Sequence, residues 1–368
     1  MKNTFGNSIS MTLFGESHGE AVGAVIDGLA PGLEVNSGVI AERLAARAPR
    51  EDETARREKD RFEILSGVFN GRTTGTPLTI VVYNDDVRSA DYSFGPARPS
   101  HADYAGWCKY HGYEDYRGGG HFSGRVTAAI AAAGGIFLPA LEKLGIRLAS
   151  HILTCGNASD RTFDSVSEDI ESLRNSSFPV LDKSAEERMK KEMAGAKAKG
   201  DSIGGAVQTA AAGLPAGLGE PWFDSVEGVL SHALFSVGGI KGVEFGEGFA
   251  CAGMCGSEFN DPLRIENGKV VSLSNHNGGV NGGITNGMPL LFTCAVRPAA
   301  SIAVEQNSVD FLRGENITVS TGGRHDPCIV RRVCPVIESM TAFVLCDMLS
   351  GRYGTDVFTR GIDGCSAD

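Results

Sequence analysis

The sequence lacks the long apolar run that a membrane span requires. Its longest nearly apolar stretch, from Val126 to Leu141, includes Gly134, Gly135 and Pro139, and it falls short of the roughly 20 apolar residues that cross a bilayer. No sustained apolar stretch follows Lys2, so we expect no cleavable signal and no membrane association. A hydrophobic content of 42% excludes a disordered or collagen-like chain.

Positive charge is scarce relative to negative charge. The formal net charge is −11, which excludes nucleic-acid binders that rely on a broad basic surface. A small anionic substrate is not excluded, because its binding depends on where individual arginines lie. The nine cysteines are odd in number and form no CxxC pair, so we expect reduced thiols and a cytoplasmic location.

Several well-known catalytic motifs are missing as well. The chain has no P-loop Gly-Lys-Ser/Thr, no GxGxxG dinucleotide fingerprint and no HExxH zinc motif. His18, His101 and His325 suggest metal ligands when they are combined with Asp103 or Asp326. Their spacing is not that of a metal site on one helix, however, and no cysteine pair supports them. We therefore expect no metal.

The pattern of apolar residues predicts one large α+β unit over residues 1–368. It predicts strands over 20–28, 77–84, 146–154, 203–212 and 243–250, and helices over 36–48, 123–144 and 335–349, the last with a proline in its first turn. The helix over 123–144 is expected to be interrupted near Gly134-Gly135 and Pro139. A capping box at Ser184–Glu187 predicts another helix, closed by Gly200. Residues 50–63 are typical of a solvated loop, and 156–183 show only weak periodicity.

Glycine is abundant, and it clusters around residues that can do chemistry. There are 49 glycines, well above the usual share of about 7%, which indicates many turns with positive φ and close backbone approaches. Four glycine-rich segments carry histidine, arginine or an acidic residue: Phe14–Gly19, Arg98–Tyr104, Asp115–Arg125 and Gly322–Cys328.

The first of these segments places Ser17 beside His18. A serine next to a histidine suggests a nucleophile and its base, but adjacent residues in a chain seldom point at one another, so we disfavour a hydrolase triad. A histidine flanked by a glycine at an exposed turn is better placed to act as an acid. A plain turn with an incidental polar pair is an equally good interpretation of this segment alone.

The third segment has three glycines followed by Ser-Gly-Arg at the start of a predicted helix. Backbone N–H groups and the helix dipole would face a phosphate or carboxylate there, with Arg125 as a bidentate fork. Taken alone, the segment is more typical of a flexible glycine turn. All four segments together indicate a pocket for a small, highly charged anion with acid–base chemistry, lined by arginines 47, 50, 98, 125 and 324.

The same segments, in this order, resemble the chorismate synthase family. The matching motifs are FGESHG at 14–19, RRExD at 56–60, ILSGVFNGRTTGTP at 64–77, RPSHADY at 98–104, DYRGGG at 115–120, GDSIGG at 200–205, PAGLGEPWFD at 215–224, SNHNGGVNGGI at 274–284 and GRHDPC at 323–328. They extend over essentially the whole chain.

The resemblance implies a β-α-β sandwich protomer, a homotetramer, and an anti-1,4 elimination that converts 5-enolpyruvylshikimate 3-phosphate into chorismate and phosphate. The reaction needs reduced FMN but consumes no net electrons. By family assignment His18 protonates the departing phosphate, and His101 protonates the reduced flavin near N1 and the C2 carbonyl. Asp326 matches the carboxylate beside flavin N5, which helps that nitrogen remove the C6 proton of the substrate.

The resemblance also implies which residues contact the ligands. Ser17, Arg47, Arg50 and Arg98 match substrate or NADP contacts. The FMN contacts match Ser123, Gly124, Arg125, Gly238, Gly239, Gly282, Arg297, Pro298, Ala299, Ala300, Ser301 and Arg324. Several differ from the commoner pattern: Gly124 stands where alanine is frequent, Gly238-Gly239 where Asn-Ala is frequent, Arg297 where lysine is frequent, and His121 where arginine is frequent.

Two competing interpretations belong to other classes of protein. One is a flavin reductase that uses NADPH directly, for which the sequence shows no nicotinamide fingerprint, so we expect an external flavin reductant. The other is a non-catalytic anion-binding protein with the same fold. Such a protein is expected to lose His18, His101 or Asp326, and all three are present.

Overall fold

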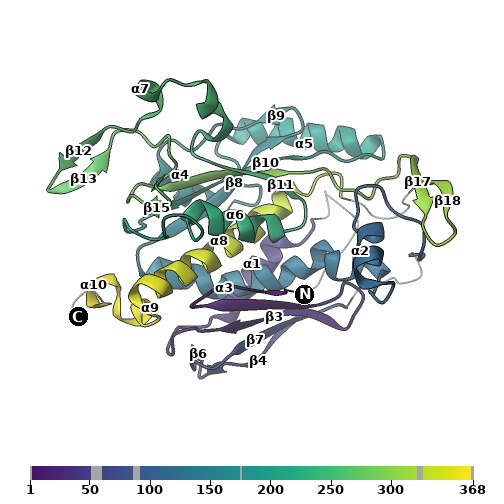
Figure 1. Ribbon diagram of the computed structural model, residues 1–368, viewed down its shortest axis with the longest axis horizontal. Coiled ribbons are helices and arrows are strands. Elements are labelled where there is room, and N and C mark those ends of the chain that lie inside the picture. Colours follow the sequence, from purple (N-terminus) through teal and green to yellow (C-terminus); the bar gives the residue numbers. More distant parts are fainter. Residues whose placement is uncertain (1, 51–59, 86–91, 175, 321–325, 366–368) are drawn as a thin grey trace.

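The structure is a computed structural model of the 368-residue chain. It describes all residues except 1, 51–59, 86–91, 175, 321–325 and 366–368. Two five-stranded sheets lie above and below a layer of helices (Figure 1), and all their strand pairs are antiparallel. This arrangement confirms the α+β class and the β-α-β sandwich.

The first sheet has the strand order β1-β2-β3-β7-β4 and the second has the order β11-β16-β10-β8-β9. The first comprises β1 (Thr4–Phe5), β2 (Ser10–Gly15), β3 (Ala21–Asp27), β7 (Leu78–Tyr83) and β4 (Phe62–Ser66). The second comprises β11 (Ile240–Phe245), β16 (Leu290–Val296), β10 (Gly205–Ala212), β8 (Arg147–Cys155) and β9 (Ala158–Ser159). The strand predicted over 243–250 begins three residues later and ends five residues later than the observed β11.

Three helices fill the space between the sheets: α1 (Ser37–Arg47), α3 (Thr127–Lys143) and α8 (Val330–Tyr353). Helix α3 packs against α1, α8 and the first sheet, and α8 packs against the second sheet. One cluster of buried apolar side chains runs through all of these elements. Helices α3 and α8 are long and apolar enough to cross a membrane. Both are mostly buried inside the protein, which identifies them as core helices.

Helix α3 is continuous, so the predicted interruption near Gly134-Gly135 was wrong. A Cβ added at Gly134 would lie 2.1 Å from the Oγ of Ser339 in α8, and one at Gly135 would lie 2.7 Å from the Cα of Ile40 in α1. The two glycines therefore let α3 approach both neighbouring helices closely. Tertiary packing outweighs the weak helix propensity of glycine and the presence of Pro139.

The boundaries of two other helices also differ from the prediction. Helix α8 begins at Val330, ahead of Pro335, which lies inside it. Helix α5 (Lys183–Ala198) is capped by the side chain of Asp182, which accepts a hydrogen bond from Ser184 N at 2.9 Å. The predicted capping box at Ser184 was therefore wrong: the N-cap lies two residues earlier, at Asp182, because aspartate is also a strong N-cap.

The remaining elements lie outside the central layer. Helices α4 (Val166–Leu173) and α5 contact strands of the second sheet, and α6 (Val226–Ser236) packs on α8 and β11. Shorter elements are α2 (Asp103–Tyr110), α7 (Gly256–Phe259), α9 (Val357–Arg360), α10 (Ile362–Cys365) and the 3₁₀ turns η2 (Arg117–Phe122), η3 (Gly124–Val126) and η4 (Gly248–Gly253). Four hairpins complete the fold: β5–β6 (Val68–Phe69, Arg72–Thr73), β12–β13 (Leu263–Glu266, Lys269–Ser272), β14–β15 (Val280–Asn281, Ile284–Thr285) and β17–β18 (Gln306–Asp310, Glu315–Val319).

The N-terminal segment is fastened to the last long helix. The carboxylate of Asp347 in α8 accepts hydrogen bonds from the backbone N–H groups of Asn7, Ser8 and Ile9 at 3.0, 2.7 and 2.8 Å. These donors lie between β1 and β2, so one buried side chain fixes the entry to the first sheet.

Candidate active site

Two glycine-rich segments that are far apart in the sequence meet at the end of the β2–β3 hairpin. Ser17 N donates to the carbonyl oxygen of Gly120 at 3.0 Å. The Nδ1 of His121 lies 2.7 Å from the carbonyl oxygen of Gly15, and since a carbonyl can only accept, Nδ1 carries the proton. The turn that bears His18 is thus tied to the turn that bears the three glycines.

The two histidines singled out in the sequence pack against consecutive glycines of that run. A Cβ added at Gly118 would lie 2.4 Å from Cδ2 and 2.5 Å from Nε2 of His18. One added at Gly119 would lie 3.0 Å from Cε1 and 3.1 Å from Nε2 of His101. Gly118, Gly119 and Gly120 all have positive φ, at 60°, 83° and 52°, a region that side chains with a Cβ rarely adopt. These glycines are required both by their backbone conformation and by the space that the imidazole rings occupy.

Tyr92 links the two histidine-bearing segments. Its ring meets the ring of His18 edge-on, with centroids 5.2 Å apart, and the guanidinium of Arg98 lies 5.6 Å from its centroid. His18, Tyr92, Arg98 and His101 therefore belong to one site, as the sequence predicts for three of them. Nothing in the sequence pattern indicated Tyr92.

Arg98 and His101 share one acidic partner, Asp103, at the start of α2. Asp103 Oδ1 lies 2.7 Å from Nδ1 of His101 and 2.7 Å from Nη2 of Arg98. Its Oδ2 accepts from the Nε and the backbone N of Arg98, both at 2.9 Å. Burial alone would raise the pKa of Asp103, but the hydrogen bonds from Arg98 and His101 outweigh it and hold the pKa well below its usual range.

Arg47 and Arg125 lie on the other side of the glycine run, and both are buried. Arg125 donates to Asp60, to Asn84 Oδ1 at 2.8 Å and to the carbonyl oxygen of Tyr83 at 2.9 Å. The predicted anion fork of Arg125 is therefore occupied by protein acceptors. Arg47 donates to Thr127 Oγ1 and to the carbonyl oxygen of Gly124, each at 3.0 Å.

Asp60 is the shared partner of these two arginines. It forms an ion pair with Arg125, and its Oδ2 lies 3.6 Å from Nη1 of Arg47, with all three side chains almost fully buried. The sequence pattern placed Asp60 in a solvated charged loop, and that placement was wrong. Its carboxylate stands just before β4 and pairs with two buried guanidinium groups.

Arg332 connects Asp326 to the backbone of Arg47. Arg332 forms an ion pair with Asp326 and donates from Nε to the carbonyl oxygen of Arg47 at 3.0 Å. Arg324 and His325 lie outside the described residues, so the structure does not place the fourth arginine-bearing segment in full. Arg50 follows α1 and is half-buried, and Ser17 is buried.

Most of the residues matched to FMN contacts lie at one end of the second sheet. Arg297 N donates to the carbonyl oxygen of Gly239 at 2.9 Å, which joins the segment 297–301 to Gly238-Gly239. Ser202 Oγ donates to the carbonyl oxygen of Ala299 at 2.7 Å, and Arg297 Nη1 to that of Pro298 at 3.0 Å. Ala300 and Ser301 follow, half-buried.

Gly282 lies apart from Gly238-Gly239 and from residues 297–301. It lies in the turn of the β14–β15 hairpin, which is tied to the start of β16 by Asn286, Gly279 and Pro289. Arg297 follows the end of β16, and a strand of seven residues spans about 20 Å. Figure 1 shows β15 on the left of the molecule and α2 on the right. Within one chain, Gly282 does not join the other matched residues.

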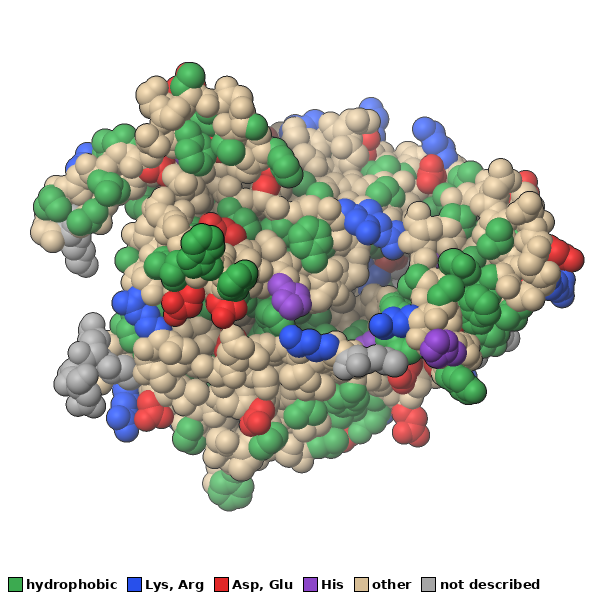
Figure 2. Space-filling view, in the orientation of Figure 1, with side chains coloured by type: hydrophobic (Ala, Val, Ile, Leu, Met, Phe, Trp, Pro, Cys, Tyr) green, Lys and Arg blue, Asp and Glu red, His purple; other side chains and the backbone are tan. Residues whose placement is uncertain are grey.

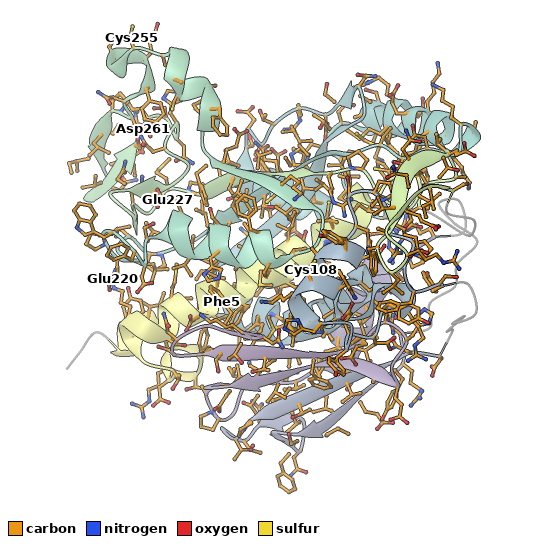
Figure 3. The ribbon with its side chains drawn as sticks, turned by 45° about the vertical axis from the view of Figure 1, so that its right-hand side comes forward. Phe5, Cys108, Glu220, Glu227, Cys255 and Asp261 are labelled. Atoms are coloured by element: carbon orange, nitrogen blue, oxygen red, sulfur yellow. The ribbon has the colours of Figure 1, made fainter. Side chains whose placement is uncertain are left out.

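The surface near these residues is concave. Figure 2 shows a hollow to the right of the centre, beside α2 and the β17–β18 hairpin, with Lys or Arg and His side chains at its rim. In Figure 3 helix α2, marked by Cys108, stands between the two sheets. Such a concave, cationic surface is suited to a small anion.

The structure also bears on two alternative interpretations. Residues 15–19 spell the letters GxSxG of a hydrolase elbow, but they join two strands of a hairpin, whereas that elbow joins a strand to a helix. Among the described residues, no three His, Cys, Asp or Glu side chains are grouped to hold a metal ion.

Comparison with known proteins identifies the family. A family model described as chorismate synthase matches residues 9–350. Chorismate synthase of Thermococcus gammatolerans is 46% identical over 358 residues, covering 96% of this chain and 99% of the relative. That of Korarchaeum cryptofilum is 44% identical over 352 residues, covering 93% and 96%.

A solved structure agrees with both sequence comparisons. It is a crystal structure of chorismate synthase, 27% identical, which superposes with a TM-score of 0.77 over 98% of this chain and 96% of that one. The resemblance drawn from the motifs is confirmed, and the chain belongs to the chorismate synthase family, whose members convert 5-enolpyruvylshikimate 3-phosphate into chorismate and phosphate with reduced FMN.

Proposed function

We propose that His18 and His101 are the proton-transferring groups of this elimination. The observation that carries the proposal is the packing of both rings against the consecutive glycines Gly118 and Gly119. A departing phosphate needs an acid, and imidazole titrates near neutral pH. His18 gives a proton to the phosphate oxygen that leaves, and His101 would supply a proton to the N1–C2 carbonyl edge of the flavin when it is bound.

Arginines bind the anionic substrate in this proposal. The substrate carries a phosphate and two carboxylates, which planar guanidinium groups match well. Arg98 stands beside His101 with only part of its fork used by Asp103. Arg47 is the last residue of α1, and Arg50 follows three residues later. Ser17, buried next to His18, completes the substrate contacts.

The residues present fit a flavin. Space is open where a Cβ would stand at Gly124 and Gly238, and Gly239 has φ of +100°, so the backbone allows a flat ring to approach closely. Ser123, Arg125 and Arg297–Ser301 lie in the adjoining segments, and Arg324 completes the set. Reduced FMN, when bound, supplies the electron density that this elimination needs. Asp326, held by Arg332, would be the carboxylate that stands beside N5 when the flavin is bound.

An anaerobic assay tests this proposal. The protein is mixed with 5-enolpyruvylshikimate 3-phosphate and dithionite-reduced FMN, and phosphate and chorismate are measured together. We expect equimolar products with the flavin still reduced, and large losses of turnover in His18→Ala and His101→Ala proteins that fold normally. Normal rates in both variants would remove the acid roles. Turnover with only NADPH and oxidised FMN would show that the protein reduces FMN itself and is bifunctional, so that no external reductant is needed.

We further infer a cytoplasmic homotetramer built from single-domain protomers. The continuous core supports one domain over residues 1–368. An arm of residues 246–274, labelled by Cys255 and Asp261 in Figure 3, extends away from α2 and exposes Phe249, Leu263, Ile265, Val270 and Leu273. Such exposed apolar side chains are typical of an interface, here with a second copy of this chain.

The remote position of Gly282 supports the same assembly. If Gly282 contacts FMN, it does so in the site of a partner copy, because it lies at the opposite end of its own second sheet. Light scattering tests the assembly: we expect four 38.7 kDa chains, and smaller species when Leu263 and Ile265 are replaced by aspartate. A wild-type monomer with full flavin affinity would overturn it.

A further inference from the structure

We propose that Asp103 is a positioning residue that fixes the tautomer of His101, so that Nε2 is the atom that takes up and releases the proton. The inference rests on the proposed role of His101 and adds a residue to it. Asp103 is the first residue of α2 and follows His101 by two residues, and its carboxylate contacts the His101 ring.

The four contacts of this carboxylate determine which atoms are donors. Oδ2 accepts from two nitrogens of Arg98, and Oδ1 accepts from Nη2 of Arg98. An ionised carboxylate can only accept, and the low pKa of Asp103 keeps it ionised. The fourth contact, with Nδ1 of His101 at 2.7 Å, is therefore a hydrogen bond only if Nδ1 carries a proton.

A competing arrangement would place the proton on Nε2. The Nη2 of Arg98 lies 3.0 Å from Nδ1 of His101 and could donate to an unprotonated Nδ1. The lone pair of that nitrogen would then face the carboxylate at 2.7 Å, which is repulsive. The shorter contact, made to a charged acceptor, is the stronger one, so Nδ1 keeps its proton.

The rest of the ring is oriented by the same bond. With Nδ1 held by Asp103, Cε1 and Nε2 lie against the bare face of Gly119. His101 and Asp103 are each about 15% exposed, so water competes weakly for this bond. Second-sphere carboxylates orient histidines in this way at other sites of proton transfer and metal binding.

A merely structural role for Asp103 predicts different behaviour. Asp103 would then only anchor Arg98, and its loss would weaken substrate binding without changing the imidazole. The neighbouring pair of Asp115 and Arg117 provides a matched control, because Asp115 accepts from Nε and Nη2 of Arg117, both at 2.8 Å. Asp115→Asn removes a more exposed Asp–Arg ion pair one segment away from His101. It is a control for the His101 tautomer and not for turnover, because Asp115 also interacts with His18.

The test combines a spectroscopic and a kinetic measurement. Histidine-¹⁵N-labelled protein without ligands is studied by magic-angle-spinning NMR, and the His101 signals are assigned by comparison with His101→Gln. In the wild type we expect neutral His101 to carry its proton on Nδ1. In Asp103→Asn the tautomer equilibrium should shift toward protonation of Nε2. Asp115→Asn should give the same tautomer as the wild type. In the anaerobic assay, kcat of Asp103→Asn falls roughly 10²-fold, and KM rises as well because Asp103 also holds Arg98. Asp103→Glu recovers part of the loss.

Three results would overturn the inference: Nε2–H in the wild type, an unchanged tautomer in Asp103→Asn, or a loss confined to KM. The wild-type spectrum and Asp103→Glu keep the test decisive even if Asp103→Asn fails to fold. Normal turnover of His101→Gln would remove the proposed acid role of His101, yet the spectra would still decide whether Asp103 sets its tautomer.

Discussion

His121 and Gly15 are joined by a 2.7 Å hydrogen bond from Nδ1 to the carbonyl oxygen, and this bond closes the turn that carries His18 onto the glycine run. His121 occupies a position at which the resemblance leads one to expect arginine.

Replacing His121 should therefore impair catalysis while leaving the fold intact. We expect His121→Ala to lower kcat roughly tenfold, because the His18 turn loses one of its ties. His121→Asn retains an N–H donor and should recover much of the rate. Stopped-flow measurement of chorismate formation under anaerobic conditions gives both values. Equal rates in the alanine variant and the wild type would show that Ser17 N and Gly120 alone hold the turn.

Gly118→Ala should be far more damaging than its size suggests. The added Cβ would lie 2.4 Å from the His18 ring, and the positive φ of 60° costs an L-residue about 1–2 kcal/mol. We expect displacement of His18 and a loss of at least ~10² in kcat. Gly195→Ala is the control, because nothing lies within 4 Å of its Cβ and it sits inside helix α5. It should raise the free energy of unfolding by up to about 1 kcal/mol. Urea unfolding and turnover are measured for both variants.

Asp60→Ala should destabilise the protein strongly. The substitution leaves the buried guanidinium groups of Arg47 and Arg125 without their shared carboxylate, and removing one partner of a buried ion pair costs about 3–5 kcal/mol. Glu142→Ala removes an exposed ion pair with Arg174 and should change stability by less than ~1 kcal/mol. Urea titrations followed by circular dichroism compare the two variants. Similar values would mean that Asp60 contributes no more than a surface charge.

The buried pair of Asp160 and His151 should make stability depend on acid pH. Burial alone would raise the pKa of Asp160, but the bond from His151 and three backbone N–H donors outweigh it and lower the pKa. A carboxyl with a lowered folded-state pKa stabilises the fold above its unfolded pKa, and the contribution is lost as pH falls through the folded value. The window thus lies below about pH 4. We expect Asp160→Asn to reduce the stability difference between pH 6 and pH 3, measured by urea unfolding. A difference as large as in the wild type would contradict this.

The sequence pattern predicted the layers of the fold better than their details. Strands such as β3 and β7 have apolar side chains on both faces and are bounded by glycine or proline, so local pattern was sufficient. The continuity of α3 depends on contacts of Gly134 and Gly135 with residues up to two hundred positions away, which no local window contains. Helices α4 and α6 are short, and they pack against β8 and β10 and against α8 and β11, contacts that no local pattern contains.

The site shows the same division. His18 and His101 could be identified from the sequence because each is a proton-transferring residue type within a glycine-rich motif. The partners that hold them were not visible in the same way. Asp60 lies in a run of mixed charge that resembles a solvated loop, and Tyr92 gains its role only from rings brought near it by folding. Arg125 was assigned to a ligand because the sequence does not show that Asn84, Tyr83 and Asp60 occupy its donors.

The three hydrogen bonds from Asn7, Ser8 and Ile9 to Asp347 have a consequence for how the chain is made. They connect positions separated by 338 to 340 residues, so the first hairpin cannot reach its final state until α8 has left the ribosome. Because α8 also fills the space between the sheets, nearly the whole polypeptide must be synthesised before the core can close. Pairings between such distant residues form slowly, and the nascent N-terminal sheet therefore waits, incompletely buried, for the last tenth of the chain.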